Sequence, residues 1–274
     1  MKRIHIIGSG PRTGTTLLAE VMISCFEIDK YSDHEARIYA DEPIEGKIFL
    51  TKHPSDYYAV NLPLALNPNL YVICIIRDPR DAIASKHGSR PDIYWAGLRY
   101  WKLFISYYDI LKKHSNFIDI KYEDFVSQPD KVQDYINSKI DFLKKKNKFS
   151  NYHNISHPNS KSINALKGVR PIKPVGIGNW KNHLPRIAGQ LQLHGDITNQ
   201  LIEFEYENNN EWLKLLDNIE PNLSNSFWPE FFTKKDLRAR KYGEKIEVIK
   251  ILSRRIGLHP TKVKTLIKKI IKRR

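Results

Sequence analysis

Cysteine and methionine are scarce in this chain, at two residues each among 274, and no apolar run is long enough to span a membrane. The two cysteines, Cys25 and Cys74, exclude a disulfide-stapled scaffold and a four-cysteine zinc module. Both lie in apolar stretches, which indicates buried thiols in a reducing compartment. The first apolar run ends at Gly8, too early for the core of a secretory signal. We therefore expect a cytoplasmic protein.

The net charge of +15 is distributed unevenly along the chain. Residues 234–274 hold 16 Lys and Arg against three acidic residues, whereas residues 1–233 hold 29 basic and 27 acidic residues. The first part is long enough to bury a core of its own. The sequence thus predicts a nearly neutral globular domain over 1–233 and a basic helical C-terminal extension over 234–274.

Within this extension, apolar residues recur at helical spacing over 261–271, and lysines fill most of the other positions. The pattern predicts an amphipathic helix over 261–274. Such a helix either makes a peripheral contact with an anionic membrane or packs on the domain with a solvated basic face. A helix-turn-helix interpretation of 249–271 would bring nucleic acid as a partner, and the sequence does not favour it.

Strand and helix patterns alternate along the first 205 residues. Short β-branched and apolar runs predict strands at 3–8, 47–51, 70–76 and 116–121. Apolar residues at helical spacing predict helices from residue 15 and over 93–113, 128–144 and 183–205. A polar segment over 144–164 is typical of a mobile loop. The alternation predicts an α/β fold around a central parallel sheet.

The most informative segment is a glycine-rich loop, residues 8–16, between the first strand and the first helix. Backbone N–H groups in such a loop, together with the helix N-terminus, bind an anion. A Walker A loop would have glycine and lysine where this chain has Ser9 and Thr15. A Rossmann fingerprint also fails, because Thr13 occupies its third glycine position. The loop predicts phosphate binding with Arg12 as its cation, and argues against an ordinary ATPase or GTPase.

Two motifs together resemble the PAPS-dependent sulfotransferases, in particular bacterial and carbohydrate-like members (PAPS is 3′-phosphoadenosine 5′-phosphosulfate). Pro-Arg-Thr-Gly-Thr-Thr over 11–16 is similar to the family's 5′-phosphosulfate loop. Arg-Asp-Pro-Arg-Asp over 77–81, followed by Ser85, resembles the family's 3′-phosphate motif. An arginine offers a planar fork to a phosphate dianion, and the serine adds a donor. The resemblance implies a P-loop-like three-layer fold that binds PAPS and needs no metal.

Later segments resemble the family in the expected order. Lys-Tyr-Glu-Asp-Phe over 121–125 implies that Tyr122 lies near the adenine, and Gly-Asn-Trp-Lys-Asn over 178–182 is similar to another family segment. Before it, Lys173 keeps one charge of the family's R-K-G motif, with Arg170 as a nearby substitute. The cofactor-binding residues implied by the resemblance are Pro11, Arg12, Thr13, Gly14, Thr15, Thr16, Arg77, Ser85, Tyr122, Arg170 and Lys173.

The implied reaction is an in-line displacement, in which the protein positions the acceptor, neutralises the leaving phosphate and removes the acceptor proton. His53, which follows the second strand, is our first candidate for the general base because histidine titrates near neutral pH. Glu35 is the rival, because carbohydrate-type relatives place a glutamate at a similar distance after the loop. Arg12 and Lys52 would supply positive charge to the reacting groups.

The sequence thus predicts transfer of a sulfuryl group from PAPS to a hydroxyl or amine of an acceptor. Aromatic residues near the site candidates, such as Tyr57 and Tyr94, favour a carbohydrate or glycolipid acceptor. A small-molecule or nucleoside kinase that binds ATP without a Walker lysine is one alternative. A non-catalytic, nucleotide-binding and membrane-docking protein is another. The sequence leaves the oligomeric state open.

Overall fold

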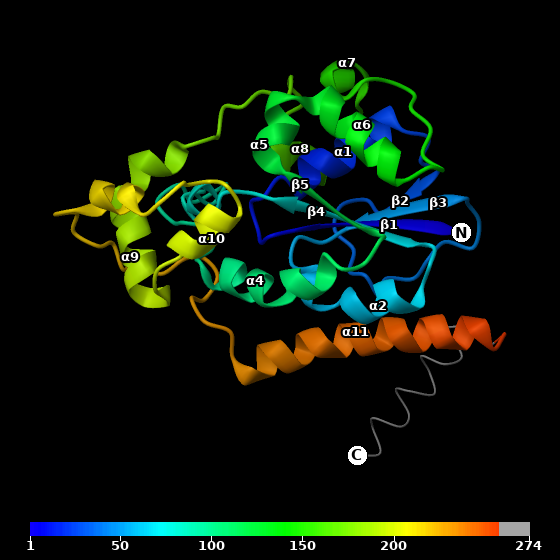
Figure 1. Cartoon of the computed structure of the whole chain (residues 1–274). Helices are drawn as coiled ribbons and strands as arrows, with labels where there is room; N and C mark the ends of the chain where they lie inside the picture. The colour runs from blue at the N-terminus through cyan, green and yellow to red at the C-terminus, as the bar shows by residue number, and fades with distance from the viewer. Residues whose placement is uncertain (258–274) are drawn as a thin grey trace.

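The computed structural model describes residues 1–257 and has a five-stranded parallel sheet at its centre (Figure 1). The strands are β1 (Lys2–Gly8), β2 (Lys30–Tyr31), β3 (Ile48–Lys52), β4 (Leu70–Ile76) and β5 (Phe117–Lys121). Their order in the sheet is β2-β3-β1-β4-β5, and every neighbouring pair is parallel. β1 and β4 are almost entirely buried, which explains their continuous apolar sequence.

Helices cover both faces of the sheet, so the fold has three layers (Figure 1). The first face carries α1 (Thr15–Cys25), α5 (Tyr122–Ser127), α6 (Pro129–Lys139), α7 (Tyr152–Ile155) and α8 (Ser160–Leu166). The second face carries α2 (Asn61–Leu66) and α4 (Arg99–Leu111), and α11 (Lys234–Arg255) runs along the outside of α2. An apolar core lies between the sheet and each helical layer. The predicted P-loop-like α/β fold is therefore confirmed.

The carboxyl ends of the strands face the part of the molecule that carries the remaining elements (Figure 1). The helices there are α3 (Pro79–Ile83), α9 (Leu184–His194) and α10 (Thr198–Glu203). In residues 1–257 the 3-10 helices are η1 (Asp56–Tyr58), η2 (Phe149–Asn151), η3 (Asn179–His183) and η4 (Glu211–Leu216). Loops at this edge of a parallel sheet form the ligand-binding crevice of open α/β folds.

The observed elements differ from the predicted ones at several places, and the helix predicted over 128–144 ends at Lys139. The helix predicted over 93–113 begins only at Arg99, because the residues before it form a bridge between Lys86 and Tyr94. The helix predicted over 183–205 is divided at Gly195, whose φ of 79° ends α9. The mobile loop predicted over 144–164 is wrong in part, because η2, α7 and α8 lie within it and two aromatic side chains of this segment are buried under α1.

The C-terminal helix α11 is capped at its start and packs against the domain. Thr233 and Asp236 form a reciprocal capping box at its N-terminus. On its inner side, the Glu247 carboxylate lies 3.3 Å from the guanidinium of Arg3 in β1. The basic amphipathic helix predicted over 261–274 lies outside the described residues. Within residues 1–257, no helix is both long and apolar enough to cross a membrane.

Replacing Glu247 by alanine should destabilise the fold. The Arg3 side chain is 1% exposed, and it would keep only Glu42, 3.4 Å away, as an acidic partner. Removing one partner of a buried ion pair costs about 3–5 kcal/mol, and we expect the lower end of that range because Glu42 remains. Urea unfolding measures the change.

The matched control is Lys245→Ala, an exposed position on the same helix. It should change the free energy of unfolding by less than about 0.5 kcal/mol. Equal effects of the two substitutions would contradict the role of the buried ion pair.

Candidate functional site

The glycine-rich loop between β1 and α1 is held in a demanding backbone conformation. Gly14 has a φ of 94°, and a Cβ at this position would lie 2.8 Å from the ring of Tyr122. Arg12 also has a positive φ, 67°, although it carries a Cβ. The Thr13 hydroxyl donates to the carbonyl oxygen of Gly10 at 2.9 Å and closes the turn. Such conformations persist where surrounding contacts enforce them, and they cluster at functional sites.

Arg77, the first residue after β4, ties the second motif to this loop. Its Nη1 donates to the carbonyl oxygen of Arg12 at 2.9 Å, and its Nη2 donates to the carbonyl oxygen of Gly176 at 2.8 Å. The guanidinium carbon lies 4.4 Å from the centre of the Tyr122 ring. Among the described residues, no carboxylate lies within 4.0 Å of this guanidinium, so its charge is available to an anion.

The neighbouring Asp78 is engaged elsewhere. Its Oδ2 lies 2.7 Å from Nη2 of Arg80, and its Oδ1 accepts the backbone N–H of Arg80 at 2.9 Å, which caps the start of α3. A pairing of Arg77 with Asp78 is therefore absent.

Arg77 lies in the wall of a cavity of about 590 Å³. Among the described residues that line this cavity, Asp81 alone is acidic. Its carboxylate is buried and accepts the backbone N–H groups of Gly178 and Trp180 at 2.8 Å. Desolvation, and then the charge of Arg77, lower the pKa of Arg12. The lining cations are Arg12, Arg77, Lys167, Arg170 and Lys173. Five cations around one carboxylate suit a ligand with several negative charges.

The structure brings six of the predicted cofactor-binding residues together in this cavity: Arg12, Arg77, Ser85, Tyr122, Arg170 and Lys173. Pro11, Thr13, Gly14, Thr15 and Thr16 do not line it. Thr13 and Thr15 are buried, at 1% and 4% exposure, and the Thr13 hydroxyl is used to close the turn. An anion at the loop would therefore meet backbone N–H groups and Arg12 rather than these two hydroxyls.

Lys167 was not predicted from the sequence. It follows α8 in the left-handed conformation, with a φ of 56°, and lines the cavity beside Gly168. The Lys-Gly pair at 167–168 could have indicated the end of a helix at this position, because helices commonly end at a residue in the left-handed conformation.

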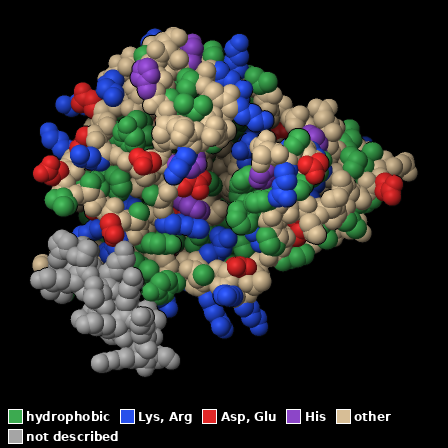
Figure 2. Space-filling model, turned by 180° about the vertical axis from the view of Figure 1, so that it is seen from behind, with side chains coloured by type: hydrophobic (Ala, Val, Ile, Leu, Met, Phe, Trp, Pro, Cys, Tyr) green, Lys and Arg blue, Asp and Glu red, His purple; other side chains and the backbone are tan. Residues whose placement is uncertain are grey.

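A second cavity, of about 490 Å³, shares the glycine-rich loop with the first. Pro11 lines the second cavity, whereas Arg12 lines the first. Both candidate bases, Glu35 and His53, line the second cavity. Basic and aromatic side chains from distant segments complete its wall: Arg37, Trp95, Arg99, Tyr100, Trp228, Phe232 and Arg240. Figure 2 shows the molecule hollowed between the sheet and the part that carries α9, with basic and histidine side chains around the hollow.

His53 is the centre of a polar network at the end of β3. Its Nδ1 lies 3.2 Å from Oδ1 of Asp56, and its Nε2 lies 3.9 Å from Oε2 of Glu35. Asp56 is fully buried, accepts the backbone N–H of Ile38 at 2.7 Å and lies 3.3 Å from Nε2 of His5. The backbone N–H of Ser55 also donates to Nδ1, at 3.3 Å. These contacts hold the imidazole at the wall of the second cavity, where it is a candidate general base.

Asp56 was not singled out in the sequence, although it follows His53 by three residues. Burial would raise the pKa of its carboxyl, but hydrogen bonds from His5 and His53 hold that pKa well below its ordinary value. Asp56 therefore stays ionised and keeps the imidazole of His53 in place.

Glu35 and Lys52 form an ion pair beside this network, with Nζ and Oε1 3.2 Å apart. Burial would raise the pKa of Glu35, but the charges of Lys52 and His53 lower it. Burial lowers the pKa of Lys52, against the attraction of Glu35. A carboxylate held ionised by a neighbouring lysine is a weak proton acceptor at neutral pH.

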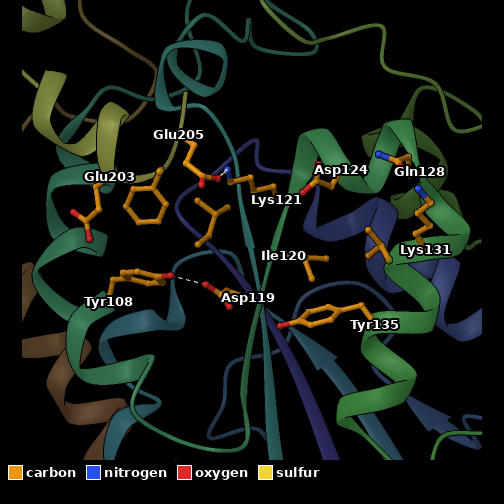
Figure 3. Close-up of a pocket in the computed structure, with 13 residues that line it drawn as sticks. Tyr108, Asp119, Ile120, Lys121, Asp124, Gln128, Lys131, Tyr135, Glu203 and Glu205 are labelled. Atoms are coloured by element: carbon orange, nitrogen blue, oxygen red, sulfur yellow. Dashed lines mark hydrogen bonds and ion pairs between the residues drawn. The ribbon is translucent and has the colours of Figure 1, made fainter. Parts of the chain in front are cut away.

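A third cavity, of about 690 Å³, lies beside the edge strand β5 and contains none of the predicted site residues (Figure 3). Its charged groups are largely matched: Tyr108 donates to Asp119, and Lys121 pairs with Glu205 at 2.6 Å. Within residues 1–257, no group of three or more His, Cys, Asp or Glu residues could hold a metal ion.

Residues 22–141 match the model of a family described as the sulfotransferase family. This range includes His53, Arg77 and Ser85 and begins after the glycine-rich loop. No curated protein matches the chain.

Similar solved structures include two sulfotransferase domains, one from the olefin synthase of Synechococcus and one from the curacin biosynthetic pathway. Each is 16% identical at a TM-score of 0.43 and covers 66% of this chain, with 87% and 91% of the respective domain covered. A mouse sulfotransferase complexed with PAP is 14% identical at a TM-score of 0.43, with 88% of this chain and 87% of that chain covered. Similarity at this identity and TM-score does not indicate which ligand or acceptor this chain binds.

The buried His5 should make stability depend on pH. Burial lowers its pKa from 6.5 to about 4, so the folded protein leaves His5 neutral where the unfolded chain binds a proton. Stability should therefore fall as pH decreases from 6.5 to 4, and a shift of this size corresponds to roughly 3 kcal/mol. Urea unfolding between pH 7 and pH 4 measures the slope.

His5→Asn should remove the part of the pH dependence of unfolding free energy that His5 causes. His157→Asn, at an exposed position, should leave that pH dependence unchanged. An unchanged slope in His5→Asn would assign the pH dependence to other groups.

Proposed function

We propose that this chain is a sulfotransferase, which the match of residues 22–141 to the model of that family supports, and that it transfers a sulfuryl group from PAPS to a hydroxyl or amine of a carbohydrate or glycolipid. The observation that carries the proposal is the position of the glycine-rich loop. It separates a cavity lined by five cations from a cavity lined by an oriented histidine. Donor and acceptor could then meet at the loop, one from each side.

The cationic cavity suits a donor that carries phosphate groups at two places. Arg12 lies at the loop and the α1 N-terminus, and Arg77 and Ser85 lie at the end of β4 and the helix that follows. Tyr122, whose ring already stacks under the Arg77 guanidinium, offers an aromatic surface between them. When bound, PAPS supplies the sulfuryl group and the leaving phosphate. Arg12 and the loop N–H groups would neutralise charge that develops on that phosphate.

His53 is our choice for the general base, ahead of Glu35. Asp56 and the backbone N–H of Ser55 contact Nδ1 and hold the ring, and His53 lines the cavity that would hold the acceptor. Glu35 is paired with Lys52, which fits a positioning role better than proton removal. The proton of the acceptor hydroxyl would pass to Nε2 of His53 as the new S–O bond forms and the bond to the leaving phosphate breaks.

Aromatic side chains around His53 support a carbohydrate acceptor. Trp95, Tyr100, Trp228 and Phe232 all line the second cavity, and the Trp228 side chain is 42% exposed. Flat apolar rings of this kind can stack on the faces of sugar rings while polar groups read their hydroxyls.

Replacing Arg77 by alanine should weaken binding of PAP, the desulfated donor, by about 10- to 100-fold, because a charged hydrogen-bond donor to phosphate is removed. Isothermal titration calorimetry of PAP and of ATP measures the change. Arg238→Ala, an exposed arginine outside the cavity, should leave PAP affinity unchanged. A preference of the unaltered enzyme for ATP would support a kinase instead and would contradict PAPS as donor.

Replacing His53 by alanine should lower turnover by about 100- to 10,000-fold, the usual contribution of a general base, and leave PAP affinity within a factor of two or so. Transfer from labelled PAPS to a panel of saccharides measures turnover. Glu35→Gln should lower turnover less than His53→Ala does, and His157→Ala, at an exposed position, should leave turnover unchanged. Near-normal turnover in His53→Ala would remove His53 from this role.

A further inference from the structure

Two arginines in the wall of the second cavity lack an acidic partner. Arg99 is 7% exposed, and its guanidinium donates only to the carbonyl oxygen of Phe231 at 2.9 Å and the hydroxyl of Tyr100 at 2.8 Å. Its Nε is buried without a hydrogen-bond partner. Among the described residues, no carboxylate lies within 4.0 Å of it. Arg99 thus brings into the cavity wall a charge without an ion-pair partner, which the more distant carboxylate of Asp236 partly offsets.

Arg240, from the second turn of α11, packs against the ring of Phe232, and so does Arg99. The guanidinium of Arg240 lies 4.3 Å from the centre of the Phe232 ring, and that of Arg99 lies 4.1 Å from it. Nη1 of Arg240 is buried and has no hydrogen-bond partner, and within residues 1–257 no carboxylate is within ion-pair distance. Two guanidinium groups therefore pack against one ring, and each has a buried N–H group without a hydrogen-bond partner.

The acidic residues of the cavity are engaged with other groups. Glu35 is paired with Lys52 at 3.2 Å. Asp236 accepts both the backbone N–H and the hydroxyl of Thr233, at 2.8 and 2.7 Å, in the cap of α11. Arg37, the third arginine here, is already paired with Asp56 at 2.8 Å. Arg99 and Arg240 are thus the cations left for an occupant of the cavity.

Holding two guanidinium groups against one ring in a partly dry site, without an ion-pair partner for either, costs free energy, and an anion that contacts both recovers part of it. An arginine fork also forms paired hydrogen bonds with planar or tetrahedral acid groups. The aromatic surface beside these arginines suits a sugar ring, as argued above.

We infer that the acceptor is an acidic saccharide, whose carboxylate or sulfate group binds Arg99 and Arg240. The inference rests on the proposed function and specifies its acceptor. Arg240 gives α11 a part in acceptor recognition, although this helix lies far from the phosphate motifs in sequence. A neutral sugar would leave both guanidinium groups unpaired and should bind more weakly.

The test is calorimetric titration of the PAP-loaded enzyme with three disaccharides that differ at one position. One carries glucuronic acid, one carries glucose at the same place, and one carries glucose 6-sulfate. At least one acidic disaccharide should bind about tenfold or more tightly than the neutral one, the usual gain from a charge-assisted contact. The acidic disaccharide that binds more tightly identifies whether the arginines recognise a carboxylate or a sulfate group.

Arg240→Gln should bring the three affinities to within about threefold of one another, and Arg240→Lys should restore part of the preference because it keeps the charge. Arg238→Gln, exposed on the same helix, should keep the full preference.

Equal affinities in the unaltered enzyme, binding of none of the three sugars, or an unchanged preference in Arg240→Gln would each overturn the inference. PAP affinity, measured in the same cell, tests the proposed donor separately. If PAP binds and the acid preference is absent, the acidic acceptor is wrong and the sulfuryl-transfer proposal stands. If PAP does not bind, the donor proposal fails, and titration of the nucleotide-free enzyme still tests the arginines.

Discussion

The hydrogen bond from the Arg77 guanidinium to the carbonyl oxygen of Arg12 fixes the arrangement on which the site depends. It joins the end of β4 to the loop that follows β1, and it holds Arg12 in a backbone conformation that this residue rarely adopts. The loop, in turn, forms a wall of two cavities, with Arg12 on one side and Pro11 on the other. The charge of Arg77 remains unpaired in the process, so the same contact that builds the loop also prepares an anion site.

The buried carboxylate of Asp56 has a similar part in the second cavity. It receives hydrogen bonds or close contacts from His5, Arg37, Ile38 and His53, so one acid orders the end of β3 and the segment before it. This arrangement orients His53 without burying it. Stability and proposed catalysis are therefore coupled at this position, since loss of the Asp56 carboxylate would affect both.

The sheet, and the positions of the glycine-rich loop and of Arg77, could be predicted because they depend on short stretches of sequence. The four strands predicted from apolar runs have observed bounds within one residue of the expected ones, and the loop and Arg77 follow adjacent parallel strands, β1 and β4, whose carboxyl ends must meet. Lys167, Asp56, Arg99 and Arg240 belong to the site through tertiary packing instead. Arg240 in particular comes from a basic extension whose composition alone suggested a solvated or membrane-facing helix. The short strand β2 has too few residues for any periodicity to reveal it.

If the loop separates a donor cavity from an acceptor cavity, a crystal structure of the enzyme with PAP will show it. We expect the 5′-phosphate at the loop N–H groups and Arg12, the 3′-phosphate at Arg77 and Ser85, and the adenine beside Tyr122. His53 should remain accessible from the second cavity. PAP bound in the cavity that contains His53, or bound away from Arg77, would contradict the account.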